Sequence, residues 1–170
     1  AEQIQERATR LASGVAIVRV GAATEIEMTE KKHRIEDALE AVRSAQQEGI
    51  VPGGGLTLYR IAQTILEDIK GIELTEGQQF AAEIFYDVLR SPMSAMCDNA
   101  GVDFDEMDAV LKGQPDNTGF NFLTSEPVDM YESGIIDPAK VTKNALQNAV
   151  SAAGTLLTTN FAIIEESDKG

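Results

Sequence analysis

The fold depends on the stretch EGIVPGGG, residues 48–55, which joins two segments whose apolar residues recur at helical spacing. Gly49 is a natural stop for the helix before it, because helices commonly end at a glycine. Gly53, Gly54 and Gly55 lack side chains, so they let the main chain approach a neighbour or a ligand closely. The sequence therefore predicts a tight turn between two helices, and it places the best internal boundary of the chain near Gly49.

Upstream of this turn the pattern predicts a helix, a short strand and a long helix. Residues 2–12 are amphipathic at helical spacing, and the β-branched run VAIVRV at residues 15–20 favours a strand. Thr24 and Glu27 have the spacing of a capping box at the start of the long helix. The stripe expected to be buried on that helix comprises Ile35, Leu39, Val42 and Ala45.

Downstream of the turn the spacing predicts more helices, one of which is capped by Thr75 and Gln78. The pair Ser91-Pro92 is typical of a helix start, so we expect a kink or a new helix there. A short helix is expected at residues 103–112. The residues expected to point inward are Leu58, Ile61, Ile65, Ile69, Phe80, Ile84, Val88, Met93, Met96 and Cys97.

The last third of the chain is less regular. Phe120 and Phe122 alternate with polar neighbours, as in a short strand or hairpin. The last long helix is expected to begin at Asp137-Pro138, and residues 161–164 suggest a terminal edge strand. The predicted fold class is mainly α, a helical bundle with a small β component.

Composition narrows the function further. The chain has 170 residues and a formal net charge of −14, which suits one acidic domain, or one domain with a small appendage. That charge disfavours binding to nucleic acid or to an anionic membrane surface. One cysteine and one histidine exclude an intrachain disulfide framework and a zinc site built from cysteines or a histidine pair. We expect no signal peptide and a cytoplasmic location.

Three features are candidates for chemistry, and each has a structural alternative. The glycine turn precedes a helix N-terminus, which attracts anions, but it also suits a tight turn with close helix packing. Asp37 lies off the expected buried stripe. Its functional role would be to order an attacking water or to help bind a magnesium ion, and the structural alternative is a solvated acid. Asp137 precedes Pro138, so it either caps a helix or binds two hydroxyls of a sugar.

Three stretches resemble group I chaperonins, the GroEL family, and they occur in that family's order and spacing. They are LASGVAIVRVGAATE at 11–25, RIEDAL at 34–39 followed by the glycine turn at 48–55, and GIIDPAKVT at 134–142. The resemblance implies that the chain is a C-terminal fragment of such a protein. Residues 1–48 would then belong to the intermediate domain, and residues 49–170 would form the C-terminal half of the equatorial ATPase domain.

The resemblance also implies a share of an ATP site, in which Asp37 matches the catalytic acid. The residues that it places against the nucleotide are Gly53 and Gly54, then Asn121, Phe122 and Leu123 at the adenine, Ile135 in the base pocket and Asp137 at the ribose. Phe122 and Leu123 stand where the family commonly has two alanines. The family's phosphate loop and magnesium ligand have no match in this sequence, so no metal ligand is assigned.

For the intact protein, the resemblance implies ATP with Mg²⁺, a ring of identical subunits, a co-chaperonin and unfolded client proteins. For the chain alone we expect no stable nucleotide binding, negligible ATPase activity and self-association through apolar stripes. Two alternatives stay open. One is a stand-alone helical module that binds other proteins without ATPase activity, and the other is a metal-dependent hydrolase that uses the many carboxylates.

Overall fold

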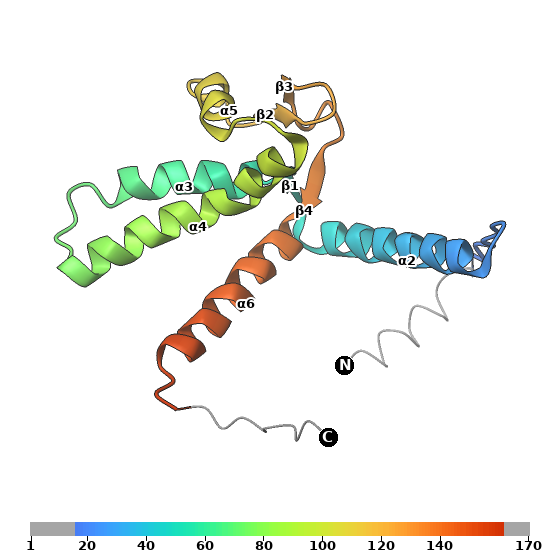
Figure 1. The fold of residues 1–170 in the computed structure, drawn as a ribbon, viewed down its shortest axis with the longest axis horizontal. Coiled ribbons are helices and arrows are strands. Elements are labelled where there is room, and N and C mark those ends of the chain that lie inside the picture. Colours follow the sequence, from blue (N-terminus) through green and yellow to red (C-terminus); the bar gives the residue numbers. More distant parts are fainter. Residues whose placement is uncertain (1–15, 162–170) are drawn as a thin grey trace, which may run out of the picture. The chain divides into compact units, whose positions relative to one another are not determined.

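The computed structural model describes residues 16–161, apart from the side chain of Leu66, and it is mainly α-helical with a small β component (Figure 1). The predicted fold class is therefore confirmed at that level. The chain divides into two compact units, residues 1–40 and 41–170. The described elements are α2 (Glu25–Glu48), β1 (Ile50–Pro52), α3 (Leu56–Asp68), α4 (Glu76–Ala100), α5 (Phe104–Leu111), β2 (Thr118–Asn121), β3 (Glu126–Asp129), β4 (Ile136–Pro138) and α6 (Ala139–Leu157).

The first unit contains most of α2, whose start follows the predicted capping pair. Oγ1 of Thr24 accepts a hydrogen bond of 3.2 Å from the Glu27 amide, and the Glu27 carboxylate accepts one of 3.3 Å from the Ala23 amide. These bonds satisfy amides that the first turn of a helix leaves without intrahelical partners. Ion pairs between residues four apart then join Glu27 to Lys31, Glu30 to Arg34 and Lys32 to Glu36.

Two predictions for this part of the chain are wrong. No residue of α2 is buried: Leu39 and Val42 of the expected core stripe are exposed, and Ile35 and Ala45 are only half-buried. Residues 16–20 form no strand, and Ile17 is 78% exposed. A strand needs hydrogen bonds from a partner, and no described segment pairs with these residues. The helix predicted at residues 2–12 lies outside the described part of the chain.

The second unit is organised around the antiparallel pairing of β1 with β4. In this register Val51 lies opposite Asp137. The junction is also tied to the start of α6, because the Ala139 amide donates a hydrogen bond of 3.1 Å to the Gly49 carbonyl oxygen and Lys143 forms an ion pair with Glu48. The end of α2 and the start of α6 are thus held at the same two-stranded ladder.

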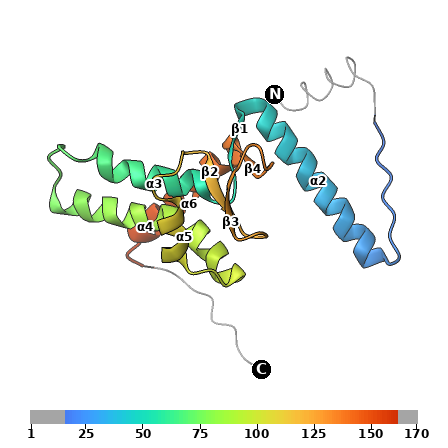
Figure 2. The same cartoon turned by 90° about the horizontal axis from the view of Figure 1, so that it is seen from above.

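Helices α3 and α4 lie side by side beyond the glycine turn (Figure 1, Figure 2). The predicted capping box of α4 is confirmed: Oγ1 of Thr75 accepts from the Gln78 amide and the Gln78 side chain accepts from the Thr75 amide. The helix ends at Ala100 and is capped by Gly101 at a φ of 69°, also as predicted. It runs through Pro92 without a new start, so of the two alternatives predicted there the new helix is wrong.

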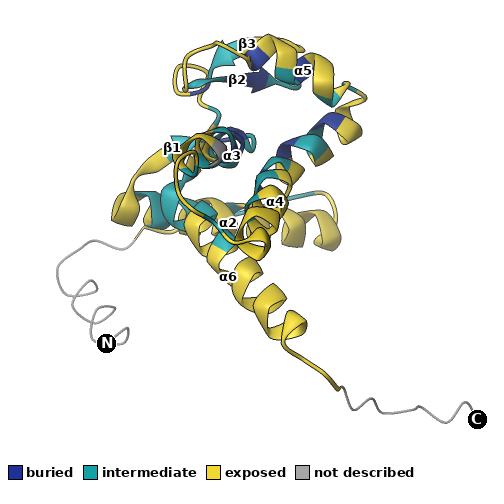
Figure 3. Ribbon diagram, turned by 90° about the vertical axis from the view of Figure 1, so that its left-hand side faces the viewer, coloured by how far each residue is buried: buried dark blue, intermediate teal, exposed yellow. Residues whose placement is uncertain are grey.

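The buried faces of these helices differ from the predicted ones (Figure 3). Met93 and Cys97 are buried as expected, together with Leu89, whereas Phe80 is 64% exposed and Ile84 and Val88 are also exposed. On α3 the buried residues are Leu56, Tyr59 and Ala62, and the predicted Ile61 is exposed. Both helices carry more than one apolar stripe, and spacing alone does not say which stripe meets the neighbour.

The hairpin of β2 and β3 and the short helix α5 complete the core. The predicted hairpin is confirmed, with Phe120 opposite Pro127. The Asp103 carboxylate caps α5 by accepting from the amides of Asp105 and Glu106 at 2.9 and 3.0 Å. The buried core consists of Leu56, Tyr59, Met93, Cys97, Met107, Leu111, Phe120 and Met130.

Helix α6 begins one residue later than predicted. Pro138 is its N-cap, and Asp137 lies in β4, so the reading of Asp137 as a helix cap is wrong. No residue of α6 is buried. Phe161 is exposed and has no secondary structure, and the rest of the edge strand predicted at 161–164 lies outside the described residues.

Candidate functional site

The first glycine of the turn lies directly against the strand segment that precedes α6. The Gly53 amide donates a hydrogen bond of 2.9 Å to the Ile135 carbonyl oxygen. A Cβ atom at Gly53 would lie 3.1 Å from the Ile136 carbonyl carbon and 3.2 Å from that of Ile135. Main-chain atoms yield less easily than a flexible side chain does, so this position favours glycine.

The next two glycines turn the chain into α3. Gly54 and Gly55 have φ angles of 60° and 76°, in the left-handed region that glycine adopts without strain. A Cβ atom at Gly55 would lie 2.9 Å from Cε of Met96 and 3.2 Å from the Met93 nitrogen, so the turn also touches α4. Close packing therefore accounts for these glycines, and the structural alternative considered for the turn is consistent with the geometry.

Asp137 lies beside this turn with an unengaged carboxylate. It stands opposite Val51 on the β1–β4 ladder, and its carboxylate has no hydrogen bond or ion pair within the described residues. Although the residue is exposed, nearby protein removes enough water to raise the pKa of the Asp137 carboxyl above its ordinary value. A carboxylate in this state gains from hydroxyl donors that would restore its lost hydrogen bonds.

The segment Asn121–Leu123 forms the tight end of the β2–β3 hairpin. Oδ1 of Asn121 accepts a hydrogen bond of 3.0 Å from the Leu123 amide, and its carbonyl oxygen accepts one of 2.8 Å from the Ser125 amide. The Phe122 ring packs edge-on to Phe120 with centroids 5.2 Å apart. Leu123 is 97% exposed. The hairpin turn therefore occupies the Asn121 side-chain oxygen, and it leaves Leu123 as a solvent-facing apolar side chain.

Met130 links the glycine turn to this hairpin, and the sequence analysis did not single it out. A Cβ atom at Gly54 would lie 3.1 Å from Cε of Met130 and 3.8 Å from Cγ2 of Ile135. A Cβ atom at Gly119, in β2, would lie 2.6 Å from the Met130 sulfur. A glycine inside a strand often marks such a close approach, so Gly119 was the available signal.

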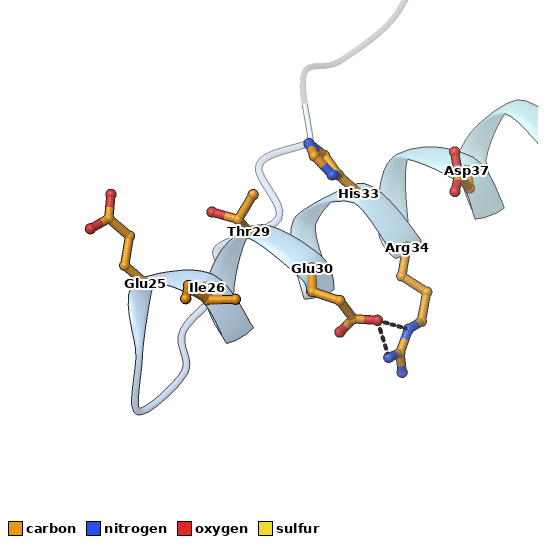
Figure 4. A pocket seen from close by; sticks show the side chains of 7 residues that line it. All are labelled: Glu25, Ile26, Thr29, Glu30, His33, Arg34 and Asp37. Carbon is orange, nitrogen blue, oxygen red and sulfur yellow. Dashed lines mark hydrogen bonds and ion pairs between the residues drawn. The ribbon is translucent and has the colours of Figure 1, made fainter.

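Asp37 belongs to the other unit, on the exposed surface of α2. Figure 4 shows it on the same stretch of helix as Thr29, His33 and the Glu30–Arg34 ion pair, which line a shallow hollow with Glu25 and Ile26. No hydrogen bond or ion pair engages the Asp37 carboxylate within the described residues. Gly53, Gly54, Ile135 and Asp137 are thus gathered at one junction of the second unit, whereas Asp37 is a feature of the first.

Two further classes of site are absent from the described residues. They contain no group of three or more His, Cys, Asp or Glu side chains arranged to hold a metal ion. Within the same residues, no helix combines the length and the apolar character needed to cross a membrane.

Comparison with known families identifies the chain. Residues 4–167 match the model of the TCP-1/cpn60 chaperonin family, which is nearly the whole sequence. The match takes in α2, the glycine turn, the hairpin and the β4–α6 junction. The chain therefore belongs to the TCP-1/cpn60 chaperonin family.

Proposed function

We propose that this chain works as part of an ATP-dependent group I chaperonin and contributes the adenine and ribose side of the ATP site. Its family membership supports assistance of protein folding as the general activity. The finer proposal depends on the β1–β4 junction, by which we mean the paired strands β1 and β4 with the glycine turn beside them. There the unengaged Asp137 carboxylate lies next to the glycine turn, whose Gly53 amide is hydrogen-bonded to the Ile135 carbonyl oxygen. That junction offers a hydrogen-bond acceptor at Asp137, a half-buried apolar side chain at Ile135 and the partly exposed main chain of Gly54 within a few residues of one another.

Each group at the junction has a defined chemical part in this proposal. Asp137 accepts hydrogen bonds from the two ribose hydroxyls, as carboxylates do in other nucleotide sites. Ile135 and the segment Asn121–Leu123 contact the adenine, and the main chain of Gly53 and Gly54 lies against the nucleotide. Leu123 supports this role through its exposure, because an apolar side chain in water gains about 25 cal/mol for each Å² that a base covers.

Asp37 is proposed to act in hydrolysis, by ordering the water that attacks the γ-phosphate. An exposed, unengaged carboxylate suits that task. We assign no residue of this chain to the phosphates or to Mg²⁺. Since phosphate positioning and metal clamping provide most of the catalysis of phosphoryl transfer, the chain alone binds nucleotide weakly and hydrolyses it negligibly.

The proposal extends to architecture and partners. Residues 1–48 form part of an intermediate domain and residues 49–170 form the C-terminal half of an equatorial domain. The intact protein assembles into a cytoplasmic ring of identical subunits and acts on unfolded clients with a co-chaperonin.

A second candidate function is a helical protein-interaction module without ATPase activity. Helix α6 favours it, because none of its residues is buried and Val141, Val150, Leu156 and Leu157 are exposed. Large apolar side chains left exposed along one helix are available for contact with another protein.

Photolabelling with 8-azido-ATP separates the two functions. At millimolar probe, the nucleotide proposal predicts cross-links within residues 119–123 or at Ile135, reduced by excess ATP and by Asp137→Asn. Asp105→Asn, a change to an exposed carboxylate on α5, serves as the matched control and leaves the labelling intact. Cross-links spread over the surface and insensitive to ATP would refute the nucleotide proposal and favour the interaction module.

A further inference from the structure

The guanidinium of Arg60 gathers main-chain carbonyls from one stretch of chain. Its Nη2 lies 3.4 Å from the Leu111 carbonyl oxygen, 3.5 Å from that of Gln114, 3.1 Å from that of Pro115 and 3.1 Å from that of Thr118. Its Nε is buried and makes no hydrogen bond. The two hydrogens of Nη2 are thus shared among four neutral carbonyl oxygens, while Nη1 donates to the Gln63 side chain at 3.4 Å.

These carbonyls belong to the connection between α5 and β2. Leu111 is the last residue of α5 and Thr118 is the first of β2. The carbonyls at the end of a helix have no intrahelical partners and carry partial negative charge, so a cation there is favourable. Arginine suits the position better than lysine, because its planar fork presents several donors at fixed angles.

The other end of this arrangement is the glycine turn. Arg60 lies on the first turns of α3, which begins at Leu56, directly after Gly55. Apolar contacts run parallel to the Arg60 contacts: a Cβ atom at Gly119 would lie 3.0 Å from Cδ2 of Leu56. One short helix segment therefore holds both the glycine turn and the entry to β2.

We propose that Arg60 is a positioning residue for nucleotide binding, which sets the place of the adenine-contacting segment 121–123 relative to the glycine turn. This inference rests on the proposed function, since it assigns a purpose to a segment given a nucleotide role there. In this proposal Arg60 itself makes no contact with the nucleotide. The residue acts through the carbonyls of residues 111–118, which fix the start of β2 and thereby the place of the hairpin turn that follows it.

Arg90 provides a matched control, because it is buried to a similar extent as Arg60 but its guanidinium contacts different groups. Its guanidinium stacks on the rings of Tyr86 and Phe104, at 4.8 and 4.7 Å from their centroids, and lies 3.6 Å from an Asp108 oxygen. Its Nε is also buried without a partner. Arg90 thus joins α4 to α5 through side chains, and none of its described contacts reaches residues 111–118.

The first experiment needs no nucleotide. Amide hydrogen exchange is measured by NMR in the full chain carrying Arg60→Met, Arg60→Lys or Arg90→Lys. We expect exchange at the amides of Thr118, Leu123 and Ser125 to rise about tenfold in Arg60→Met and less in Arg60→Lys, with amides of the α3–α4 core changing less than about twofold. Unchanged exchange at residues 118–125, or an equal rise in Arg90→Lys, would overturn the positioning role.

The second experiment separates positioning from general stability. Chemical-shift titrations compare ATP with ribose 5-triphosphate, which lacks the base. Arg60→Met is expected to reduce the preference for ATP about fivefold while affinity for ribose 5-triphosphate stays within about twofold, with partial recovery in Arg60→Lys. A preference for ATP that Arg60→Met leaves unchanged contradicts this inference alone. Absence of ATP-dependent shifts in the unsubstituted chain contradicts the proposed function, and the exchange result then decides separately whether Arg60 holds the hairpin.

Discussion

The Gly53 amide donates a hydrogen bond of 2.9 Å to the Ile135 carbonyl oxygen, so two segments distant in sequence meet main chain to main chain. This contact fixes the glycine turn against the strand that carries Asp137. The tolerance of this contact to an added methyl group at Gly53 can be measured directly.

Replacing each glycine of the turn by alanine is expected to destabilise the fold to different extents. Gly53→Ala brings a methyl group within 3.1 Å of main-chain carbon, which costs about 2 kcal/mol. Gly54→Ala meets only side-chain atoms, Cε of Met130 at 3.1 Å and Cγ2 of Ile135 at 3.8 Å, and its positive φ costs about 1 kcal/mol. Urea unfolding measures both. The control is Gly77→Ala, whose Cβ would meet nothing within 4 Å. If Gly77→Ala lowered the free energy of unfolding as much as Gly53→Ala, the account would be contradicted.

Tyr59→Phe is expected to weaken the contact between α3 and α5. The buried Tyr59 hydroxyl donates a hydrogen bond of 2.6 Å to Oδ1 of Asp108, and its loss costs about 1–2 kcal/mol in urea unfolding. Tyr131→Phe, a change to an exposed tyrosine, is the control and stays within about 0.5 kcal/mol.

The same phenol adds a pH dependence. Burial, followed by the hydrogen bond to Asp108, raises the pKa of Tyr59 well above its ordinary value. Above pH of about 10 the unfolded chain releases this proton while the folded chain keeps it, so stability falls as pH rises. The free energy of unfolding is therefore expected to fall less between pH 8 and pH 11 in Tyr59→Phe than in the unsubstituted chain. Equal losses would mean that the hydroxyl is solvated.

Self-association is expected through the exposed stripe of α4. Phe80, Ile84 and Val88 lie on one face of that helix, and each exposes a large apolar side chain. Sedimentation velocity should show a mass that rises with concentration, and less so for Phe80→Gln with Ile84→Gln. Val110→Gln, on α5, is the control. A monomeric mass over the whole concentration range would refute the expectation.

Asp37→Asn is expected to separate catalysis from folding in the ring protein that we propose. The side chain is exposed and unengaged, so unfolding should change by less than about 0.5 kcal/mol. Loss of a carboxylate that orders the attacking water should lower ATP turnover at least about 100-fold. Glu36→Gln, its exposed neighbour, is the control. Turnover that survives Asp37→Asn would remove Asp37 from the mechanism.

Local signals in the sequence predicted most helix ends. The Thr75–Gln78 box, the stop at Gly101 and the short helix predicted at residues 103–112 all depend on residues within a few positions of one another. The mainly α class followed from the same signals. Pro92 misled the prediction, because its local preference for a helix start was overridden by packing of Leu89 and Met93 on either side.

The buried faces and the links within the site depended on contacts that no local pattern encodes. Phe80 and Met93 are both apolar residues of α4, and only the segments that pack against this helix decide that Met93 is the buried one. The Arg60 contacts and the wedge of Met130 between Gly54 and Gly119 join residues far apart in sequence. Periodicity also cannot tell a core stripe from one left exposed, as on α2 and α6.

Asp137→Asn allows the nucleotide role to be tested without disturbing the fold. Because desolvation raises the pKa of the folded carboxyl, its ionised form disfavours the folded state, and stability falls as pH rises through that range. Asparagine removes this effect. Asp137→Asn is therefore expected to be at least as stable as the unsubstituted chain at pH 7. At pH 3 the difference in free energy of unfolding between the two chains should be smaller, as measured by urea unfolding.

The central claim is tested most directly by residue-resolved NMR of the chain titrated with ATP to millimolar concentration. The account predicts saturable shifts at the amides of Gly54, Asn121, Ile135 and Asp137, smaller shifts with tripolyphosphate, and loss of the ATP response in Asp137→Asn. Shifts confined to other surfaces, or identical in Asp137→Asn, would contradict the assignment of the β1–β4 junction as the adenine and ribose side of an ATP site.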